Sequence, residues 1–435
     1  MSENKQKFDT LKIRAGYNPK DHNYAVSVPI YQTTSYDLGG TERANRIVTY
    51  QQDAWLYTRI NNPTVDVLEK RAAALDGAPA ALALSSGMAA ITYTLFTLAE
   101  NGGRILTSPY LYGGTFDSYK SILPRFGIEF DFSKNIENIQ ELEKEIKPNT
   151  KAVFVESISN PNSTLVDISA LAELAHKHNI PLIVDNTVAT PYLFNPFEHG
   201  ADIVIYSATK ALSGHGNVIA GLIVDGGKFK WSKEKFPQFH KKHYTLRDAG
   251  GSSRSYLEVF GDIAFVGKAR MDYLNYFGSA LSPFDAYLVL IGIETLSERI
   301  EKHIANTKKI LKYLEKSPYV EKLNHPTLQS SPYNALAKKY FPKGAGSILS
   351  FEIKGGQERG QKFIDTLKIF TYLANLGDAK SLIIDPFKVT HGELTDDDLA
   401  LAKIPLNLIR LSIGLEDPDD LIADLEQAFQ KTAQY

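Results

Sequence analysis

Short apolar runs alternate along the middle of the chain with segments in which apolar residues recur at helical spacing. The apolar runs lie at 104–108, 151–157, 181–187 and 201–210. Between two of them, residues 168–179 carry apolar residues about every three to four positions, as one face of a helix does. Buried strands that alternate with helices are typical of a parallel sheet covered on both faces. We therefore predict an α/β domain over residues 63–280.

The two ends of the chain have different patterns. Residues 1–62 are rich in Pro, Asn, Thr and Tyr and lack a sustained apolar period. We expect an irregular arm that packs on something else, most simply a neighbouring subunit. Residues 283–316 have the pattern of one or two long helices, and strands then mix with helices to the end. The pattern predicts a smaller α+β C-terminal domain over residues 281–435.

Composition narrows the class of protein. A chain of 435 residues is long enough for two or more domains, and its net charge of -2 lacks the basic excess of nucleic-acid binders. There are no cysteines, which excludes disulfides and a cysteine nucleophile. The polar N-terminus has no signal-peptide pattern, and no apolar run reaches the roughly 18 residues that span a bilayer. We expect a soluble cytoplasmic protein with no nucleic-acid or membrane partner.

Lys210 is the first candidate for chemistry. The run ADIVIYSATK is apolar up to Tyr206 and then ends in Ser207, Ala208, Thr209 and Lys210. In open α/β sheets, ligands bind beyond the carboxyl ends of the strands. A lysine in such a dry pocket loses its proton easily and can attack a carbonyl, and the two hydroxyls could bind a phosphate. A surface lysine at a strand end would have the same local sequence.

Asp185 ends a second apolar run in the same way. A carboxylate beside a pyridine nitrogen keeps that nitrogen protonated and makes the ring a stronger electron sink. An aspartate that caps a helix or a turn is equally compatible with this position.

Further candidates come from loops and from the arm. Gly87 precedes an apolar helical run, so the backbone there could bind a phosphate at a helix N-terminus. Tyr112 precedes two glycines and could stack on a flat heterocycle. Tyr57 and Arg59 lie in the arm, and arginine is the usual bidentate ligand of phosphate. Arg410 lies within an apolar run, where its partner could be a substrate carboxylate or a structural Asp or Glu.

Other catalytic motifs are absent from the sequence. No dinucleotide-binding, Walker A, zinc-protease or serine-hydrolase motif occurs. His176 and His178 are two residues apart and cannot face the same side of a helix. We expect no metal site.

Taken together, the segments resemble the Cys/Met-metabolism family of enzymes that depend on pyridoxal 5′-phosphate (PLP). The matching segments occur in the family's order over nearly the whole chain. They are YTRINNPT (57–64), SSGMAA (85–90), LYGGT (111–115), SNPN (159–162), VDNT (184–187), SATK (207–210), SPF (282–284), ETLSER (294–299), ANLGDAKSL (374–382) and RLSIGLE (410–416). The resemblance implies the aspartate aminotransferase-like fold, fold type I, in which residues 63–280 form the PLP-binding domain.

The resemblance also implies roles for individual residues. Lys210 would form the Schiff base and move protons, Asp185 would pair with the pyridinium nitrogen, and Tyr112 would stack on the ring and assist catalysis. Asn160 would lie near the ring hydroxyl, and Arg410 with the backbone near Asn375 would hold the substrate carboxylate. The phosphate ligands would be Gly87, Met88, Ser207 and Thr209, together with Tyr57 and Arg59 of a neighbouring subunit. Because the sheet-domain ligands are neutral, Arg59 would supply the positive charge, which implies a homodimer or homotetramer with shared active sites.

Within the family, the chain is most similar to the O-acetylhomoserine sulfhydrylase branch. YGGT at 112–115, ANLGDAK at 374–380 and VDGGKFKW at 224–231 carry this resemblance. The implied reaction is γ-replacement on O-acetylhomoserine by sulfide or a thiol, which gives homocysteine and acetate. The segment 385–391 and the pair Ser213-Gly214 depart from the branch pattern. The alternatives are cystathionine γ-synthase or γ-lyase chemistry in the same family, a PLP-binding protein without turnover, and a structural protein.

Overall fold

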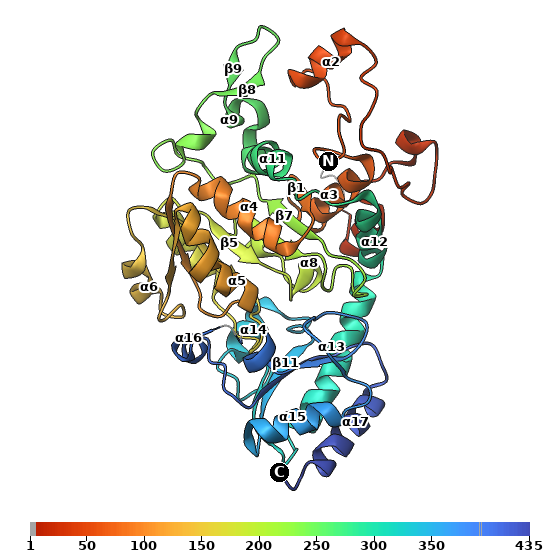
Figure 1. Cartoon of the computed structure of the whole chain (residues 1–435), viewed down its shortest axis with the longest axis vertical. Helices are drawn as coiled ribbons and strands as arrows, with labels where there is room; N and C mark the ends of the chain where they lie inside the picture. The colour runs from red at the N-terminus through yellow and green to blue at the C-terminus, as the bar shows by residue number, and fades with distance from the viewer. Residues whose placement is uncertain (1–5, 391, 393) are drawn as a thin grey trace.

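The computed structural model describes residues 6–390, 392 and 394–435. Figure 1 shows a larger domain in red to green and a smaller domain in blue, with helix α13 running from one to the other. The larger domain is built around a seven-stranded sheet and the smaller domain around a five-stranded sheet. Within the described part of the chain, no helix combines the length and apolar content needed to cross a bilayer.

The seven-stranded sheet has the order β1-β7-β6-β5-β4-β2-β3. Its strands are β1 (Ala80–Leu84), β2 (Gly103–Thr107), β3 (Ile128–Phe132), β4 (Thr150–Glu156), β5 (Leu182–Asp185), β6 (Ile203–Ser207) and β7 (Gly221–Asp225). Only β7 runs antiparallel to its neighbours, and the other pairs are parallel. The predicted mostly parallel central sheet is therefore confirmed.

Both faces of this sheet are buried. Along β4, Val153 and Val155 belong to one apolar core, whereas Ala152 and Phe154 belong to the core on the opposite face. This alternation is what a strand produces when helices cover both of its faces. The first core contains side chains of α3 (Pro63–Asp76), α7 (Ile168–Lys177) and α12 (Pro283–Glu294). The second contains side chains of α4 (Gly87–Ala99) and α10 (Ala264–Lys268).

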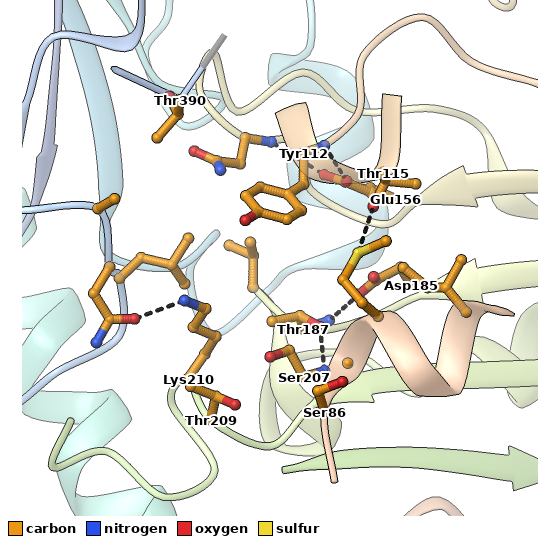
Figure 2. A pocket seen from close by; sticks show the side chains of 18 of the residues that line it. Ser86, Tyr112, Thr115, Glu156, Asp185, Thr187, Ser207, Thr209, Lys210 and Thr390 are labelled. Atoms are coloured by element: carbon orange, nitrogen blue, oxygen red, sulfur yellow. Dashed lines mark hydrogen bonds between the residues drawn. The ribbon is translucent and has the colours of Figure 1, made fainter. Parts of the chain in front are cut away.

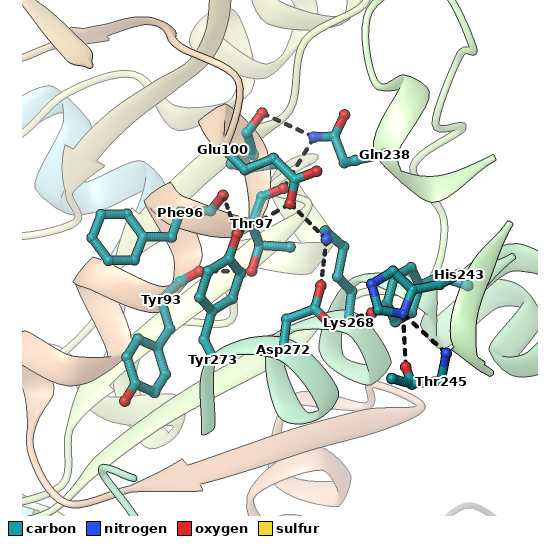
Figure 3. Close-up of polar contacts among 12 residues, drawn as sticks. Tyr93, Phe96, Thr97, Glu100, Gln238, His243, Thr245, Lys268, Asp272 and Tyr273 are labelled. Atoms are coloured by element: carbon teal, nitrogen blue, oxygen red, sulfur yellow. Dashed lines mark hydrogen bonds and ion pairs between the residues drawn. The ribbon is translucent and has the colours of Figure 1, made fainter. Parts of the chain in front are cut away.

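The N-terminus of helix α4 faces the candidate site, and contacts at its other end fix the position of the helix. At the far end, Gln238 donates to the carbonyl oxygens of Thr97 and Leu98, each at 3.1 Å. There the ammonium of Lys268, only 4% exposed, pairs with Glu100 at 2.6 Å and Asp272 at 2.5 Å (Figure 3). These contacts fasten α4 to α10 and to the excursion that follows β7.

The smaller domain contains a sheet with the order β10-β11-β14-β13-β12. The strands are β10 (Val320–Asn324), β11 (Ile348–Ile353), β12 (Thr371–Tyr372), β13 (Leu382–Ile384) and β14 (Leu408–Ser412). Helices α13 (Leu296–Leu314), α15 (Gly356–Thr366) and α17 (Pro418–Lys431) contribute to its apolar core. The remaining helices are α1 (Phe8–Arg14), α2 (Thr41–Val48), α5 (Gly113–Asp117), α6 (Ile139–Glu145), α8 (Thr190–Leu193), α9 (Tyr256–Phe260), α11 (Asn275–Phe277), α14 (Asn334–Tyr340) and α16 (Asp396–Leu401).

The N-terminal arm contains short helices that the sequence pattern did not reveal. Helix α1 is fixed to its own chain, because the buried ammonium of Lys12 pairs with Glu298 at 2.6 Å. Helix α2 instead projects away from the body of the molecule, on the same side as the hairpin β8–β9 (His243–Arg247 and Ser253–Arg254) (Figure 1). Tyr24 and Val26, which precede α2, are strongly exposed. The arm thus combines an anchored start with an extended, partly apolar middle.

Candidate active site

A cavity of about 260 Å³ lies where the carboxyl ends of β4, β5 and β6 meet the smaller domain. Its walls carry residues from both domains, and Figure 2 shows their side chains. The lining residues are Ser86, Gly87, Met88, Ile91, Tyr112, Thr115, Glu156, Ile158, Asn160, Asp185, Thr187, Val188, Ser207, Thr209, Lys210, Ile219, Ala374, Asn375, Leu376, Thr390 and Arg410. The position agrees with the rule that ligands bind beyond the carboxyl ends of parallel strands.

Lys210 follows β6 by three residues and points into the cavity (Figure 2). Its Nζ donates a hydrogen bond to Oδ1 of Asn375, which belongs to the smaller domain, at 2.7 Å. Burial, and then the positive charge of Arg410, lowers the pKa of the Lys210 amine to about 8. A larger fraction of this amine is neutral near pH 7 than in an exposed lysine, as attack on a carbonyl requires.

Asp185 and Glu156 form a pair of buried carboxyl groups at one side of the cavity. They are the last residues of β5 and β4, and they lie opposite each other in the parallel register. Burial raises the pKa of Asp185 and, with the Asp185 charge added, raises the pKa of Glu156 well above its usual range. Among the ion pairs formed by the described residues, none involves either carboxyl group. A bound group that carries a positive N–H would therefore find an uncompensated acceptor at Asp185.

A group of small and hydroxyl-bearing residues forms a cradle at the start of α4. Ser86 caps this helix, because its Oγ accepts the N–H of Ala89 at 3.1 Å, and Ser207 and Thr209 line the same end of the cavity. Gly87 has no room for a side chain, since a Cβ there would lie 2.8 Å from Cβ of Ser207. The free N–H groups of a helix N-terminus attract anions. Lys210 and Arg410 are the cationic side chains among the lining residues, and neither comes from this cradle.

Tyr112 lies across the mouth of the cavity, with its side chain 43% exposed (Figure 2). Its backbone N–H donates to Oε1 of Glu156 at 2.6 Å, which fixes the loop that carries the ring. A Cβ at Gly114 would lie 2.7 Å from Cε1 of Tyr112, so the glycine lets the ring fold back over its own loop. The backbone of Tyr112 is thus held by a buried carboxyl group, while its ring stays partly exposed and could stack on a flat ligand.

Arg410 is buried in β14 and has no acidic partner among the described residues. Its Nη1 donates to Oδ1 of Asn160 at 2.9 Å, and its Nη2 donates to the backbone oxygen of Asn375 at 2.6 Å. Its Nε is buried without a hydrogen-bond partner. The sequence left a structural acid and a substrate carboxylate open as partners, and the geometry favours the second. A buried cation surrounded by neutral acceptors can bind a carboxylate strongly.

The structure brings most of the predicted site residues to this cavity but not two of them. Lys210, Asp185, Tyr112, Asn160 and the other members predicted in the larger domain line it, as do Asn375 and Arg410. Tyr57 and Arg59 lie instead beside residues 278–283, and the guanidinium of Arg59 stands 4.9 Å from the Tyr57 ring. In the single chain they do not reach the cavity, so their predicted role in a neighbouring subunit stays a prediction.

Sequence reasoning missed some of the lining residues. Glu156 is the clearest case, although it ends an apolar strand as Asp185 does and could have been found by the same signal. Of the segment that departs from the branch pattern, Thr390 lines the cavity, whereas His391 lies outside the described residues. Asp385 is buried, and its Oδ1 accepts the N–H of Lys388 at 3.0 Å.

Comparison with known proteins gives consistent results. The family model for Cys/Met metabolism PLP-dependent enzymes matches residues 9–430. A sulfhydrylase of Fusarium oxysporum f. sp. lycopersici is 44% identical, with 98% of each chain covered. The homocysteine synthase of Schizosaccharomyces pombe is 43% identical, with 99% of this chain and 100% of that protein covered.

A solved structure extends the likeness to three dimensions. It is the crystal structure of a Campylobacter jejuni protein named as an O-acetylhomoserine (thiol)-lyase, which contains a pyridoxyl-lysine phosphate residue. The TM-score is 0.93 at 38% identity, with 98% of this chain and 100% of that chain covered. The match over residues 9–430, the relatives at 43–44% identity and the shared three-dimensional structure show that the chain belongs to the Cys/Met metabolism family of PLP-dependent enzymes.

Proposed function

We propose that the protein is a transferase that replaces the γ-acetoxy group of O-acetyl-L-homoserine with sulfide, or with a thiol, to give L-homocysteine and acetate. The observation that carries the proposal is the arrangement of the cavity. The Lys210 amine lies between a cradle at the start of α4 and a buried arginine for which the described residues provide no acidic partner. The names of the relatives, sulfhydrylase and homocysteine synthase, favour this reaction over γ-synthase and γ-lyase chemistry.

The residues of the cavity suit PLP. Bound there, the cofactor would supply an aldehyde for the amino group and an electron sink for charge that develops at carbon. Lys210 would hold it covalently, Asp185 would accept the N–H of its ring, and Tyr112 would cover one ring face. The cradle of Gly87, Met88, Ser207 and Thr209 would take the phosphate, and Asn160 would meet the ring hydroxyl.

Lys210 is also the proposed proton carrier. When the substrate amine takes its place, the freed Nζ is neutral enough to accept a proton from the substrate Cα, because burial has lowered its pKa to about 8. Asn375 Oδ1, 2.7 Å from Nζ, lies where it can hold the freed amine inside the cavity. Tyr112 lies over the same space and would exclude water and assist the transfer.

Arg410 would select amino acids among possible substrates. Its guanidinium offers a charged fork to an α-carboxylate, and its contacts with Asn160 and Asn375 set the direction of that fork. Ile91, Met88 and Ile219 give the cavity apolar walls that suit an uncharged acyl chain. A succinyl group carries an additional carboxylate. Besides Lys210 and Arg410, the lining residues include no cation to pair with it, which favours an acetyl group.

We further propose that the active site is shared between two subunits of a homodimer or homotetramer in the cytoplasm, where the polar substrates of amino-acid synthesis are available. The cradle lacks a cation of its own, and Arg59 in the arm would bring one from a neighbouring subunit. Exposed aromatic side chains near the end of the larger domain support such a contact. They are Tyr276, Phe277 and Phe284.

A product assay tests the reaction. The purified enzyme with PLP is given O-acetyl-, O-succinyl- or O-phosphohomoserine, each with sulfide or with cysteine, and the products are measured by mass spectrometry. We expect O-acetylhomoserine with sulfide to have the highest kcat/KM and to give homocysteine. A higher kcat/KM for O-succinylhomoserine with cysteine would assign the protein to γ-synthase chemistry instead.

A further inference from the structure

We propose that Glu156 is a positioning residue that clamps two loops around the cofactor ring, one carrying Tyr112 and the other carrying Asn160. The proposal rests on the proposed function, because it concerns the ring that these two residues would contact. It assigns a task to a buried carboxyl group to which the proposed function gives no role in binding the cofactor or the substrate.

The geometry of the clamp is direct. Oε1 of Glu156 accepts the backbone N–H of Tyr112 at 2.6 Å, and Oε2 accepts the backbone N–H of Asn160 at 3.2 Å. The two donors lie 44 residues before and 4 residues after Glu156 in the chain. A single side chain at the end of β4 therefore joins the loop that follows β2 to the loop that follows its own strand.

The Tyr112 loop depends on this contact. Tyr112 begins the five-residue helix α5 without a hydrogen bond from its own side chain to the backbone of that helix. A helix this short supplies little stability of its own. The oxygens of Glu156 can accept backbone N–H groups whether or not the carboxyl group carries a proton, and a buried N–H that lost its acceptor would be left unpaired.

The Asn160 loop links the clamp to substrate binding. Oδ1 of Asn160 accepts a hydrogen bond from Nη1 of Arg410 at 2.9 Å, so Glu156 lies two contacts away from the proposed carboxylate site. A shift of the Asn160 backbone would move both the group that meets the ring hydroxyl and one partner of Arg410. Glu156 thus fixes the backbone at Tyr112 and Asn160 and, through Asn160, one partner of Arg410.

The chemistry of the clamp requires a carboxyl group of this length. Two backbone donors need two acceptor oxygens, and glutamine offers one oxygen and one N–H₂ group in nearly the same volume. In Glu156→Gln one donor would face another donor. Glu156→Ala removes both acceptors and leaves a small void. We therefore expect the cofactor ring to be held most firmly in wild type, less firmly in Glu156→Gln and least firmly in Glu156→Ala.

The test measures the bound cofactor as well as turnover. Wild type, Glu156→Gln and Glu156→Ala are purified without cofactor, titrated with PLP, and compared by visible circular dichroism, by the rate of cofactor loss to hydroxylamine, and by steady-state kinetics. For Glu156→Gln we expect a smaller visible dichroism, faster cofactor loss and a kcat lowered roughly tenfold or more, the effect of one buried N–H that loses its acceptor. For Glu156→Ala we expect larger changes of the same kind.

Glu69→Gln is the matched control. Glu69 is as buried as Glu156, at 7% exposed. Its Oε1 accepts the N–H of Ala83 at 2.9 Å and its Oε2 pairs with Arg270 at 2.6 Å, but it lies outside the cavity. We expect this variant to keep the dichroism and cofactor retention of wild type. Wild-type dichroism and cofactor retention in Glu156→Gln would overturn the proposal, as would equal losses in Glu69→Gln. Wild-type protein that binds no PLP would instead overturn the proposed function.

Discussion

Asp185 is buried, and none of the described residues forms an ion pair with it, an arrangement that destabilises the free protein and favours a ligand with a positive N–H. Asp185→Asn should keep the fold, because the amide oxygen can still accept the N–H of Thr187 as Oδ1 does at 3.0 Å. The neutral amide cannot hold a ring nitrogen protonated, so the electron sink weakens and kcat should fall well over threefold. Steady-state kinetics measure this. A kcat within about threefold of wild type, a difference of only ~0.7 kcal/mol, would contradict the proposed role.

Asp76 predicts a pH dependence of stability at a position away from the site. Its Oδ1 accepts the hydroxyl of Tyr206 at 2.8 Å, its Oδ2 is buried without a partner, and burial raises its pKa to about 7. The pKa of Asp76 is thus higher in the folded protein than in the unfolded chain. Because of this difference, the protonated carboxyl group favours the folded state at low pH, and this stabilisation is lost as the pH rises to 7. Between pH 5.5 and pH 8 the free energy of unfolding should fall by about 2 kcal/mol more in wild type than in Asp76→Asn.

Urea unfolding of both proteins at the two pH values tests this expectation. Asparagine keeps an oxygen for the Tyr206 hydroxyl but cannot ionise, so only the pH-dependent part of the stability should change. Equal pH dependence in the two proteins would show that Asp76 does not titrate as its burial indicates.

At the scale of elements, the position of α4 depends on a cluster at its far end. Lys268→Met keeps the length of the side chain but leaves Glu100 and Asp272 without their shared cation (Figure 3). Removal of one partner from a buried ion pair costs about 3–5 kcal/mol, and partial exposure of the two acids reduces this to roughly 2–3 kcal/mol here. Urea unfolding measures the loss.

Lys362→Met is the control for this cluster. Lys362 pairs at 2.8 Å with Glu358, whose side chain is largely exposed, and solvent screens such surface pairs so that they add little to stability. We expect the control to unfold nearly as wild type does. If the two variants lose the same stability, the Lys268 cluster does not fasten α4.

Much of the larger sheet could be predicted from local pattern. The apolar runs before Asp185 and Lys210 correspond to β5 and β6, since a strand buried on both faces needs apolar residues throughout. The sequence pattern did not reveal β7, which follows a glycine-rich segment and pairs antiparallel with β1 and β6. Strand order and direction depend on distant pairings, and local composition does not encode them.

In the candidate site too, the sequence predicts single residues better than the contacts between distant segments. Lys210 and Asp185 could be identified because each is a polar residue at the end of an apolar strand. The contact between Lys210 and Asn375 joins residues 165 positions apart, and the neutral surroundings of Arg410 depend on which loops pack around β14. These are properties of tertiary packing, and no local pattern expresses them.

At the scale of the whole molecule, the shared-site proposal makes a sharp prediction. Arg59→Ala and Lys210→Ala should each be inactive, the first because the phosphate loses its cation and the second because no amine remains to bind the cofactor. When subunits of the two variants exchange, each mixed dimer should contain one site with wild-type Arg59 and wild-type Lys210. Activity should recover to a fraction of the wild-type value.

Mass spectrometry of differently tagged subunits would verify that exchange has occurred. Mixed dimers that remain inactive would show that Arg59 serves its own subunit. Each variant incubated alone under the same conditions is the control, and it should stay inactive.

The order of the elements along the chain has a consequence for biosynthesis. The seven-stranded sheet is complete once β7 has been made, whereas the strands of the smaller sheet begin at Val320 and Arg410 belongs to the last of them. A ribosome-bound chain can thus present the lysine, the cradle and Asp185 well before the arginine fork exists. If the proposed roles hold, we expect binding of the cofactor to become possible before recognition of the amino acid, and only the later step to make the catalyst selective.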